Sequence, residues 1–123
     1  MRYDPEIAPD PDEWLASTEA ERLDAVRRRH QTARHQAGSP QLHVAIHVTV
    51  ENQLAERHRD ATEAMDRLLA EGLRRHEALH AIGSVVAAEM FEILKSGRIH
   101  DPEVYSRKLQ ELTAAAWRTG EDA

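Results

Sequence analysis

Glycine and proline residues divide this chain into stretches that each carry a helical pattern. Gly38 and Pro40 end the first long stretch, Gly72 can form a left-handed helix cap, and Gly97 ends the longest stretch. Between these breaks apolar residues recur every three to four positions, and no run alternates with a period of two between hairpin turns. We therefore predict an all-α fold, a compact bundle of about five helices with no sheet, the helices covering residues 18–35, 41–57, 60–71, 75–96 and 102–118.

The starts of these helices also have recognisable signals. Thr18 and Glu21 form a capping-box pattern, and Asp101 and Pro102 supply an N-cap and a first-turn proline. Residues 1–12 hold three of the five prolines and several aspartates, a composition typical of irregular chain. We predict an N-terminal arm over residues 1–12 and one helical domain over residues 13–119, since 123 residues suit a single core.

Composition excludes several classes of function. The chain has no cysteine, so any bound metal would have histidine and carboxylate ligands. A net charge of −6 disfavours general binding to nucleic acids, and the basic cluster at 27–29 lies among acidic neighbours. Because neither a membrane span nor a signal peptide is visible, we expect a cytoplasmic protein. Nothing in the sequence indicates a small-molecule substrate.

The second predicted helix carries a polar ladder inside its apolar face. His43, His47 and Glu51 are spaced i, i+4 and i+8, so they lie one above another among aliphatic side chains. Polar groups on a buried face need partners. Glu51 could bind a metal, accept a hydrogen bond from an imidazole N–H, or pair with an arginine such as Arg75, and we favour the second role.

The fourth predicted helix repeats this arrangement with His76 and His80. Both lie within the apolar arc of that helix, which comprises Leu79, Gly83, Val86, Ala87, Met90, Phe91 and Leu94. If the two helices pack antiparallel, four imidazoles converge on one point. We predict a divalent metal bound by His43, His47, His76, His80 and Glu51, with zinc as the first choice and iron or manganese as alternatives. The alternative is a metal-free structural or protein-interaction module with a buried histidine network.

Residues 76–80 also match the His-Glu-x-x-His pattern of zinc peptidases. In that reading Glu77 is the catalytic residue, which activates a metal-bound water. Such peptidases place a sheet beside the helix, and the sequence predicts none. Glu77 also has a structural explanation, because an acid at the third helical position after Arg74 favours the helix terminus.

Other residues receive weaker assignments. His30 could be a further ligand or could lie at an exposed helix end, and Glu89 and Glu92 are expected in solvent. The aromatic residues Trp14, Phe91 and Trp117 are among those expected in the core or at an interface. A homodimer would stabilise so short a chain through extra burial.

Two segments resemble a known family. The segment His43-x-x-x-His47-x-x-x-Glu51-Asn52-Gln53 and the later segment from His76 to Ser84 resemble those of small bacterial helical domains of unknown function, which carry similar H-x-x-x-H and H-E-A-x-H segments. The likeness extends to Trp14-Leu15 and Glu21-Arg22, and so covers most of residues 13–95. This resemblance implies a helical fold and a grouping of the histidines, without a particular activity.

Overall fold

The structure is a computed structural model that describes residues 1–33 and 40–122, with the side chains of residues 30–33 and 120–122 left out. Within this part of the chain all regular structure is α-helical, which confirms the predicted all-α fold. The helices are α1 (Pro11–Ala16), α2 (Glu19–Ala33), α3 (Pro40–Ala55), α4 (Arg59–Ala70), α5 (Arg75–Ser96), α6 (Pro102–Glu111) and α7 (Ala114–Asp122).

Local signals account for most helix boundaries. The backbone N–H of Thr18 donates to Glu21 at 2.8 Å and that of Glu21 donates to Thr18 at 3.1 Å, so the predicted capping box precedes α2. Gly72 and Gly97 adopt φ angles of 101° and 73°, the left-handed conformation that ends α4 and α5. The N-terminal arm is shorter than predicted, because Asp10 already caps α1.

The last predicted helix is in fact two helices, so the prediction of one helix over residues 102–118 is wrong. Leu112 is extended and separates α6 from α7. Arg67 of α4 and the C-cap of that helix, Glu71, stabilise this break. Arg67 donates to the carbonyl oxygens of Leu109 and Leu112 at 2.6 and 3.1 Å, and Glu71 accepts the backbone N–H of Ala114 at 2.7 Å. Side chains from a distant helix thus satisfy the backbone groups that the break exposes.

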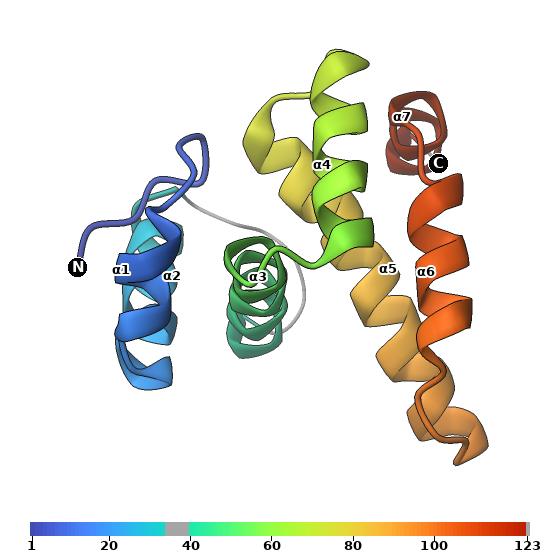
Figure 1. Ribbon diagram of the computed structural model, residues 1–123, viewed down its shortest axis with the longest axis horizontal. Helices are drawn as coiled ribbons and strands as arrows, with labels where there is room; N and C mark the ends of the chain where they lie inside the picture. Colours follow the sequence, from blue (N-terminus) through green and yellow to red (C-terminus); the bar gives the residue numbers. More distant parts are fainter. Residues whose placement is uncertain (34–39, 123) are drawn as a thin grey trace.

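Helix α3 lies at the centre of the bundle. Figure 1 shows α1 and α2 on one side of it, α4 and α5 on the other, and α6 and α7 beyond those. Two hydrophobic clusters follow from this order. The smaller one, between α3 and the N-terminal helices, contains Trp14, Val26, Val44 and Val48; the larger one joins α3, α4, α5, α6 and α7 and includes Val50, Leu68, Ile82 and Leu109.

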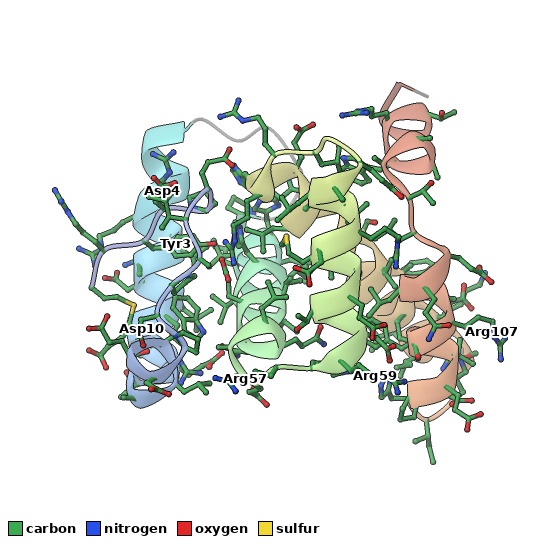
Figure 2. The ribbon with its side chains drawn as sticks, turned by 45° about the horizontal axis from the view of Figure 1, so that its top comes forward. Tyr3, Asp4, Asp10, Arg57, Arg59 and Arg107 are labelled. Carbon is green, nitrogen blue, oxygen red and sulfur yellow. The ribbon has the colours of Figure 1, made fainter. Side chains whose placement is uncertain are left out.

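The N-terminal arm packs on the bundle rather than extending into solvent. Tyr3 points from the arm toward α3 (Figure 2), and Pro5 is fully buried. Arg75 at the start of α5 donates to the carbonyl oxygen of Pro5 at 3.0 Å, and Arg28 of α2 donates to that of Met1 at 3.2 Å. The arm therefore joins both halves of the fold.

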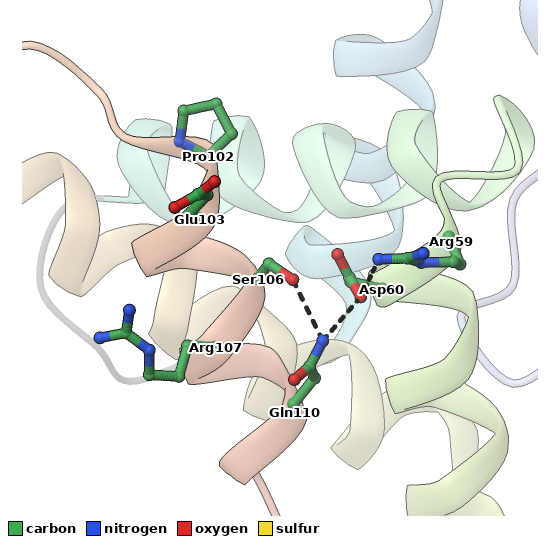
Figure 3. Close-up of a pocket in the computed structure, with 7 residues that line it drawn as sticks. All are labelled: Arg59, Asp60, Pro102, Glu103, Ser106, Arg107 and Gln110. Carbon is green, nitrogen blue, oxygen red and sulfur yellow. Dashed lines mark hydrogen bonds and ion pairs between the residues drawn. The ribbon is translucent and has the colours of Figure 1, made fainter.

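A surface pocket lies where α4 meets α6. Asp60 accepts a hydrogen bond from Gln110 at 3.3 Å inside it, beside Ser106 and Arg59 (Figure 3). Hydrogen bonding by Ser106, reinforced by Gln110 and opposed by burial, lowers the pKa of Asp60. Since the lining residues include no histidine, this pocket is separate from the predicted metal site.

One expectation for the C-terminal half of α5 is wrong. Glu89 is buried instead of solvated, because α6 and its preceding loop return along this flank and surround the carboxylate with Arg98, His100 and Lys108. Phe91 and Leu94 are exposed by 63% and 82%, although they continue the apolar arc of the helix. Among the helices that the structure describes, none is both long and apolar enough to cross a membrane.

Candidate metal centre

The polar ladder of α3 lies between two apolar faces of that helix. Val44 and Val48 belong to the smaller hydrophobic cluster, whereas Val50, with Ile46 packed beside it, belongs to the larger one. At roughly 100° per residue, the positions of His43, His47 and Glu51 fall between these faces. His47 is 3% exposed and Glu51 is 1% exposed, so the ladder is an interior feature of the fold.

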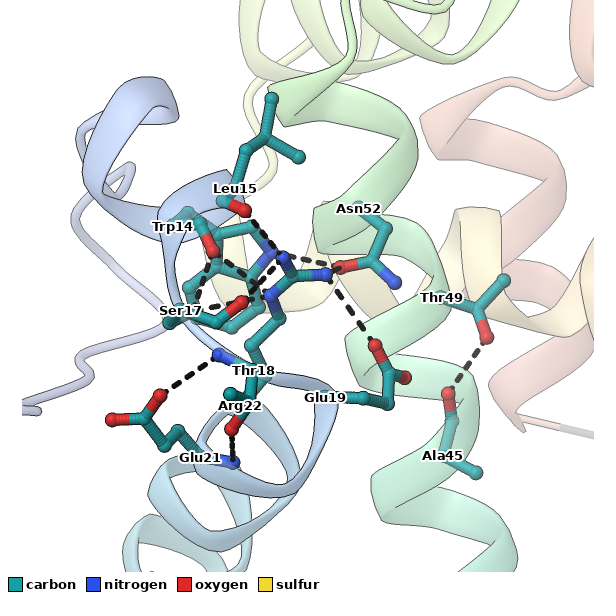
Figure 4. A network of polar contacts seen from close by, with 10 residues as sticks. All are labelled: Trp14, Leu15, Ser17, Thr18, Glu19, Glu21, Arg22, Ala45, Thr49 and Asn52. Carbon is teal, nitrogen blue, oxygen red and sulfur yellow. Dashed lines mark hydrogen bonds and ion pairs between the residues drawn. The ribbon is translucent and has the colours of Figure 1, made fainter.

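A hydrogen-bond network on the opposite side fixes the rotation of α3 about its own axis. Trp14 Nε1 donates to Asn52 Oδ1 at 2.8 Å, and Arg22 Nη1 donates to the same oxygen at 3.2 Å (Figure 4). Arg22 also donates to the carbonyl oxygen of Trp14 at 2.8 Å. Because Asn52 follows Glu51 directly, this network also sets the direction in which the ladder points.

Helix α5 approaches α3 closely at Gly83. A Cβ atom at this position would lie 3.0 Å from Cγ2 of Ile46, so only glycine fits without displacing that side chain. The contacts run in opposite directions along the two helices: His43 faces His80, whereas Glu51 meets Arg75. The two helices are therefore antiparallel over this stretch, as the convergence of the histidines requires.

Four imidazoles meet in the space between α3 and α5. The ring centroids of His43 and His80 are 5.0 Å apart, those of His47 and His80 are 5.9 Å apart, and those of His76 and His80 are 4.4 Å apart. One possible ligand atom from each of His43, His47 and His80 lies within 4.8 Å of the other two. His76 lies beside this three-histidine group rather than in it.

The three-histidine group fits a small divalent cation. Zinc takes imidazole nitrogens at about 2.0–2.1 Å, which places two ligand nitrogens of a tetrahedral site about 3.3 Å apart. The nitrogens at up to 4.8 Å would have to approach by at most about 1.5 Å, a shift within reach of side-chain rotation. Imidazole also suits iron, so the donor set alone does not select one metal.

Glu77 does not take part in this group. Its carboxylate accepts the backbone N–H of Arg74 at 3.2 Å, which is the helix-capping role considered for it. The His-Glu-x-x-His match also lacks the sheet of a zinc peptidase in the described residues. The local sequence is therefore explained by the start of α5.

Glu51 forms an ion pair with Arg75, which was the third of the three roles considered for it. Arg75 Nη1 and Nη2 each donate to one carboxylate oxygen of Glu51 at 2.9 Å. Glu51 also accepts a hydrogen bond from the hydroxyl of Tyr3, and Tyr3 Oη lies 2.7 Å from His47 Nε2. The hydroxyl of Tyr3 thus links the carboxylate of Glu51 to the imidazole of His47. From the sequence we favoured a direct hydrogen bond between Glu51 and an imidazole.

Tyr3 is the member of the site that the sequence did not reveal. Burial, reinforced by the neighbouring Glu51, raises the pKa of its phenol, so the hydroxyl keeps its proton. Burial tends to lower the pKa of Arg75, but Glu51 outweighs this effect and the net change is upward. The arm also reaches the start of α5, where Glu6 accepts the backbone N–H of His76 at 3.3 Å and pairs with Arg74 at 3.2 Å.

Two further described histidines, His58 and His100, lie outside the cluster. His58 caps α4 by accepting the backbone N–H of Ala61 at 3.1 Å, and His100 contacts Glu89 at 3.2 Å. The side chain of His30, considered as a further ligand, and the whole of His35 lie outside the described residues.

Comparison with known proteins gives one result. Neither the curated proteins nor the solved structures include a match to this chain. The model of one family, a domain of unknown function called DUF1841, matches residues 12–111, a range that includes α3, α5 and all four clustered histidines. The chain therefore belongs to the DUF1841 family.

Proposed function

We propose that this protein binds a divalent metal ion through His43, His47 and His80, with zinc as the first choice. The observation that carries the proposal is the convergence of three imidazole ligand atoms to within 4.8 Å of one another, from two helices. Metal sites in helical bundles are built in this way, from side chains on facing helices. Iron and manganese are the alternatives that the ligand types allow.

His76 is the first choice for a further ligand. Its ring centroid lies 4.4 Å from that of His80 and 5.5 Å from that of His47. Four histidines around zinc would close the coordination sphere and favour a structural role, whereas three would leave a position for water. In a three-ligand site the metal would lower the pKa of that water toward neutrality.

Glu51 supports the site from outside the first coordination sphere in this proposal. Its two oxygens accept three hydrogen bonds from Arg75 and Tyr3, which occupy most of the acceptor positions of the carboxylate. Metal-binding histidines commonly hydrogen-bond to a second group that orients the ring. The contact between Tyr3 and His47 has this form.

The test is elemental analysis of protein purified without a histidine tag, before and after incubation with zinc, iron(II) or manganese. We expect about one equivalent of metal, lost in a His43→Ala/His80→Ala variant. His100→Ala is the matched control, since His100 lies outside the cluster, and it should keep its metal. Wild-type protein that stays metal-free after all three incubations would refute the proposal and favour the metal-free histidine network.

The exposed end of α5 favours self-association as a second function. Phe91 and Leu94 form an apolar patch on the face of α5 that, nearer its start, packs on α3. At about 100° per residue, Met90, which is 42% exposed, lies on the same face, and the exposed side chain of Lys95 lies at its edge. An apolar face of this kind can pack against the same face of a second copy, as a two-fold interface requires. The proposed partner is a second copy of this chain.

A further inference from the structure

Tyr3 contacts both the most buried histidine and the most buried carboxylate of the candidate metal centre. Its hydroxyl donates to Glu51 Oε2 and lies 2.7 Å from His47 Nε2. Its ring packs against Trp14 with a centroid distance of 5.7 Å and against His47 with one of 5.5 Å. The phenol is therefore held from several sides.

The protons of this chain of groups can be assigned from chemistry. Glu51 is a carboxylate paired with Arg75, which donates to both of its oxygens, and a carboxylate only accepts hydrogen bonds. In the contact between Tyr3 and Glu51 the Tyr3 hydroxyl is therefore the donor, and its single proton points to Glu51. The Tyr3 oxygen then accepts a hydrogen bond from His47. For this, His47 must carry its proton on Nε2.

We propose that Tyr3 is a positioning residue of the metal centre, which holds His47 in the Nε2–H tautomer and thereby presents Nδ1 to the metal. In a neutral imidazole the nitrogen without the proton carries the lone pair that binds a metal. The inference rests on the proposed function for its metal step, whereas the tautomer of His47 is a property of the metal-free protein. Arg75 and Glu51 act through Tyr3, because they fix the direction of its hydroxyl.

The first test measures the tautomer directly. Long-range ¹H–¹⁵N NMR spectra of metal-free protein labelled at histidine nitrogen distinguish protonated from unprotonated ring nitrogens, and a His47→Gln variant assigns the His47 signals. We expect a protonated Nε2 and an unprotonated Nδ1 in the wild type, and a mixture of tautomers in Tyr3→Phe. A wild-type His47 protonated on Nδ1 would overturn the inference.

The second test measures zinc affinity by competition with a chromogenic chelator. Tyr3→Phe keeps the aromatic ring and removes the hydroxyl, and we expect it to weaken binding by about 10–100-fold. Tyr105→Phe is the matched control: it removes another largely buried phenol, which donates to Gln53 at 2.8 Å on a different part of α3. The control should bind zinc within about twofold of wild type, with a loss of melting temperature similar to that of Tyr3→Phe.

The two tests separate this inference from the proposed function. Equal zinc affinities of Tyr3→Phe and wild type would overturn the positioning role while leaving the metal site intact. If the wild type bound no metal, the proposed function would fail and the metal step of this inference with it, and the NMR result would still decide the tautomer of His47.

Discussion

The guanidinium group of Arg75 binds both carboxylate oxygens of Glu51, with two N–O distances of 2.9 Å. This ion pair joins the C-terminal part of α3 to the first turn of α5, directly beside the clustered histidines. Glu51 is 1% exposed, so its charge is shielded by its partners and not by water. Removing either partner would leave the other charge buried without compensation, and the fold would lose stability.

Replacing Arg75 by methionine should strongly destabilise the fold. The change leaves the Glu51 carboxylate buried without its main cationic partner, which costs about 3–5 kcal/mol of the free energy of unfolding. Urea denaturation measures this loss. Arg27→Met is the control, since Arg27 pairs with Asp24 on the surface and should contribute at most about 1 kcal/mol. Equal losses of unfolding free energy in the two variants would show that groups other than Arg75 compensate the charge of Glu51.

The close contact of α3 and α5 predicts that Gly83 does not tolerate a larger residue. Gly83→Val adds side-chain atoms where even a Cβ would lie 3.0 Å from Ile46, and overpacking of this kind costs about 1–3 kcal/mol. The better helix propensity of valine offsets less than about 1 kcal/mol. Thermal unfolding should show the loss, and Ser84→Val, at an exposed position of the same helix, should lack it.

Most of the fold could be predicted because its signals are local. Each residue that marks the end of α4, or the beginning or end of α5, lies next to that helix end in the sequence. Both predicted ends of α5 agree with the structure. The break between α6 and α7 could not be predicted in this way. It depends on Arg67 and Glu71, which lie more than forty residues earlier in the chain and become neighbours only after folding.

The same distinction applies to the site. His43, His47 and His80 were found because a helical period places them on inward faces. Tyr3 was missed because it lies in an arm without a repeating pattern, 44 residues from His47. Burial of Glu89 was missed because the helical period of α5 alone does not show that α6 covers this flank.

The buried position of Glu89 predicts a pH dependence of stability. Hydrogen bonds from Arg98, opposed by burial, hold the pKa of Glu89 at about 2, below its ordinary value of 4.5. The folded state thus binds this proton less readily than the unfolded state. The stabilisation is complete above pH 4.5 and is lost as the pH falls toward 2.

Glu89→Gln should therefore be less stable than wild type by about 2 kcal/mol at pH 7, and the difference should shrink between pH 4.5 and 2.5. Urea unfolding at a series of pH values measures it. Glu92→Gln, at an exposed position of the same helix, controls for the loss of a negative charge. A stability difference that stayed constant with pH would contradict the lowered pKa of Glu89.

If the apolar patch of α5 binds a second copy of the chain, polar substitutions there should produce a monomer. Phe91→Ser/Leu94→Ser removes the two exposed side chains that would be buried, and light scattering after size exclusion measures the mass. Ile7→Ser, at a site that is 66% exposed and outside the patch, should leave the mass unchanged. A monomeric wild type at high concentration would exclude this interface.

Metal binding predicts a specific gain in stability, because an ion that binds only the folded state shifts the folding equilibrium. At a free zinc concentration of 100 times Kd the gain is about 2.7 kcal/mol, or roughly 10 °C in Tm for a domain of this size. A chelator should reverse the shift. His43→Ala/His80→Ala should melt at the same temperature with and without zinc, whereas His100→Ala should respond as the wild type does. A shift that persisted in the double variant would place the bound ion at residues other than the three-histidine group.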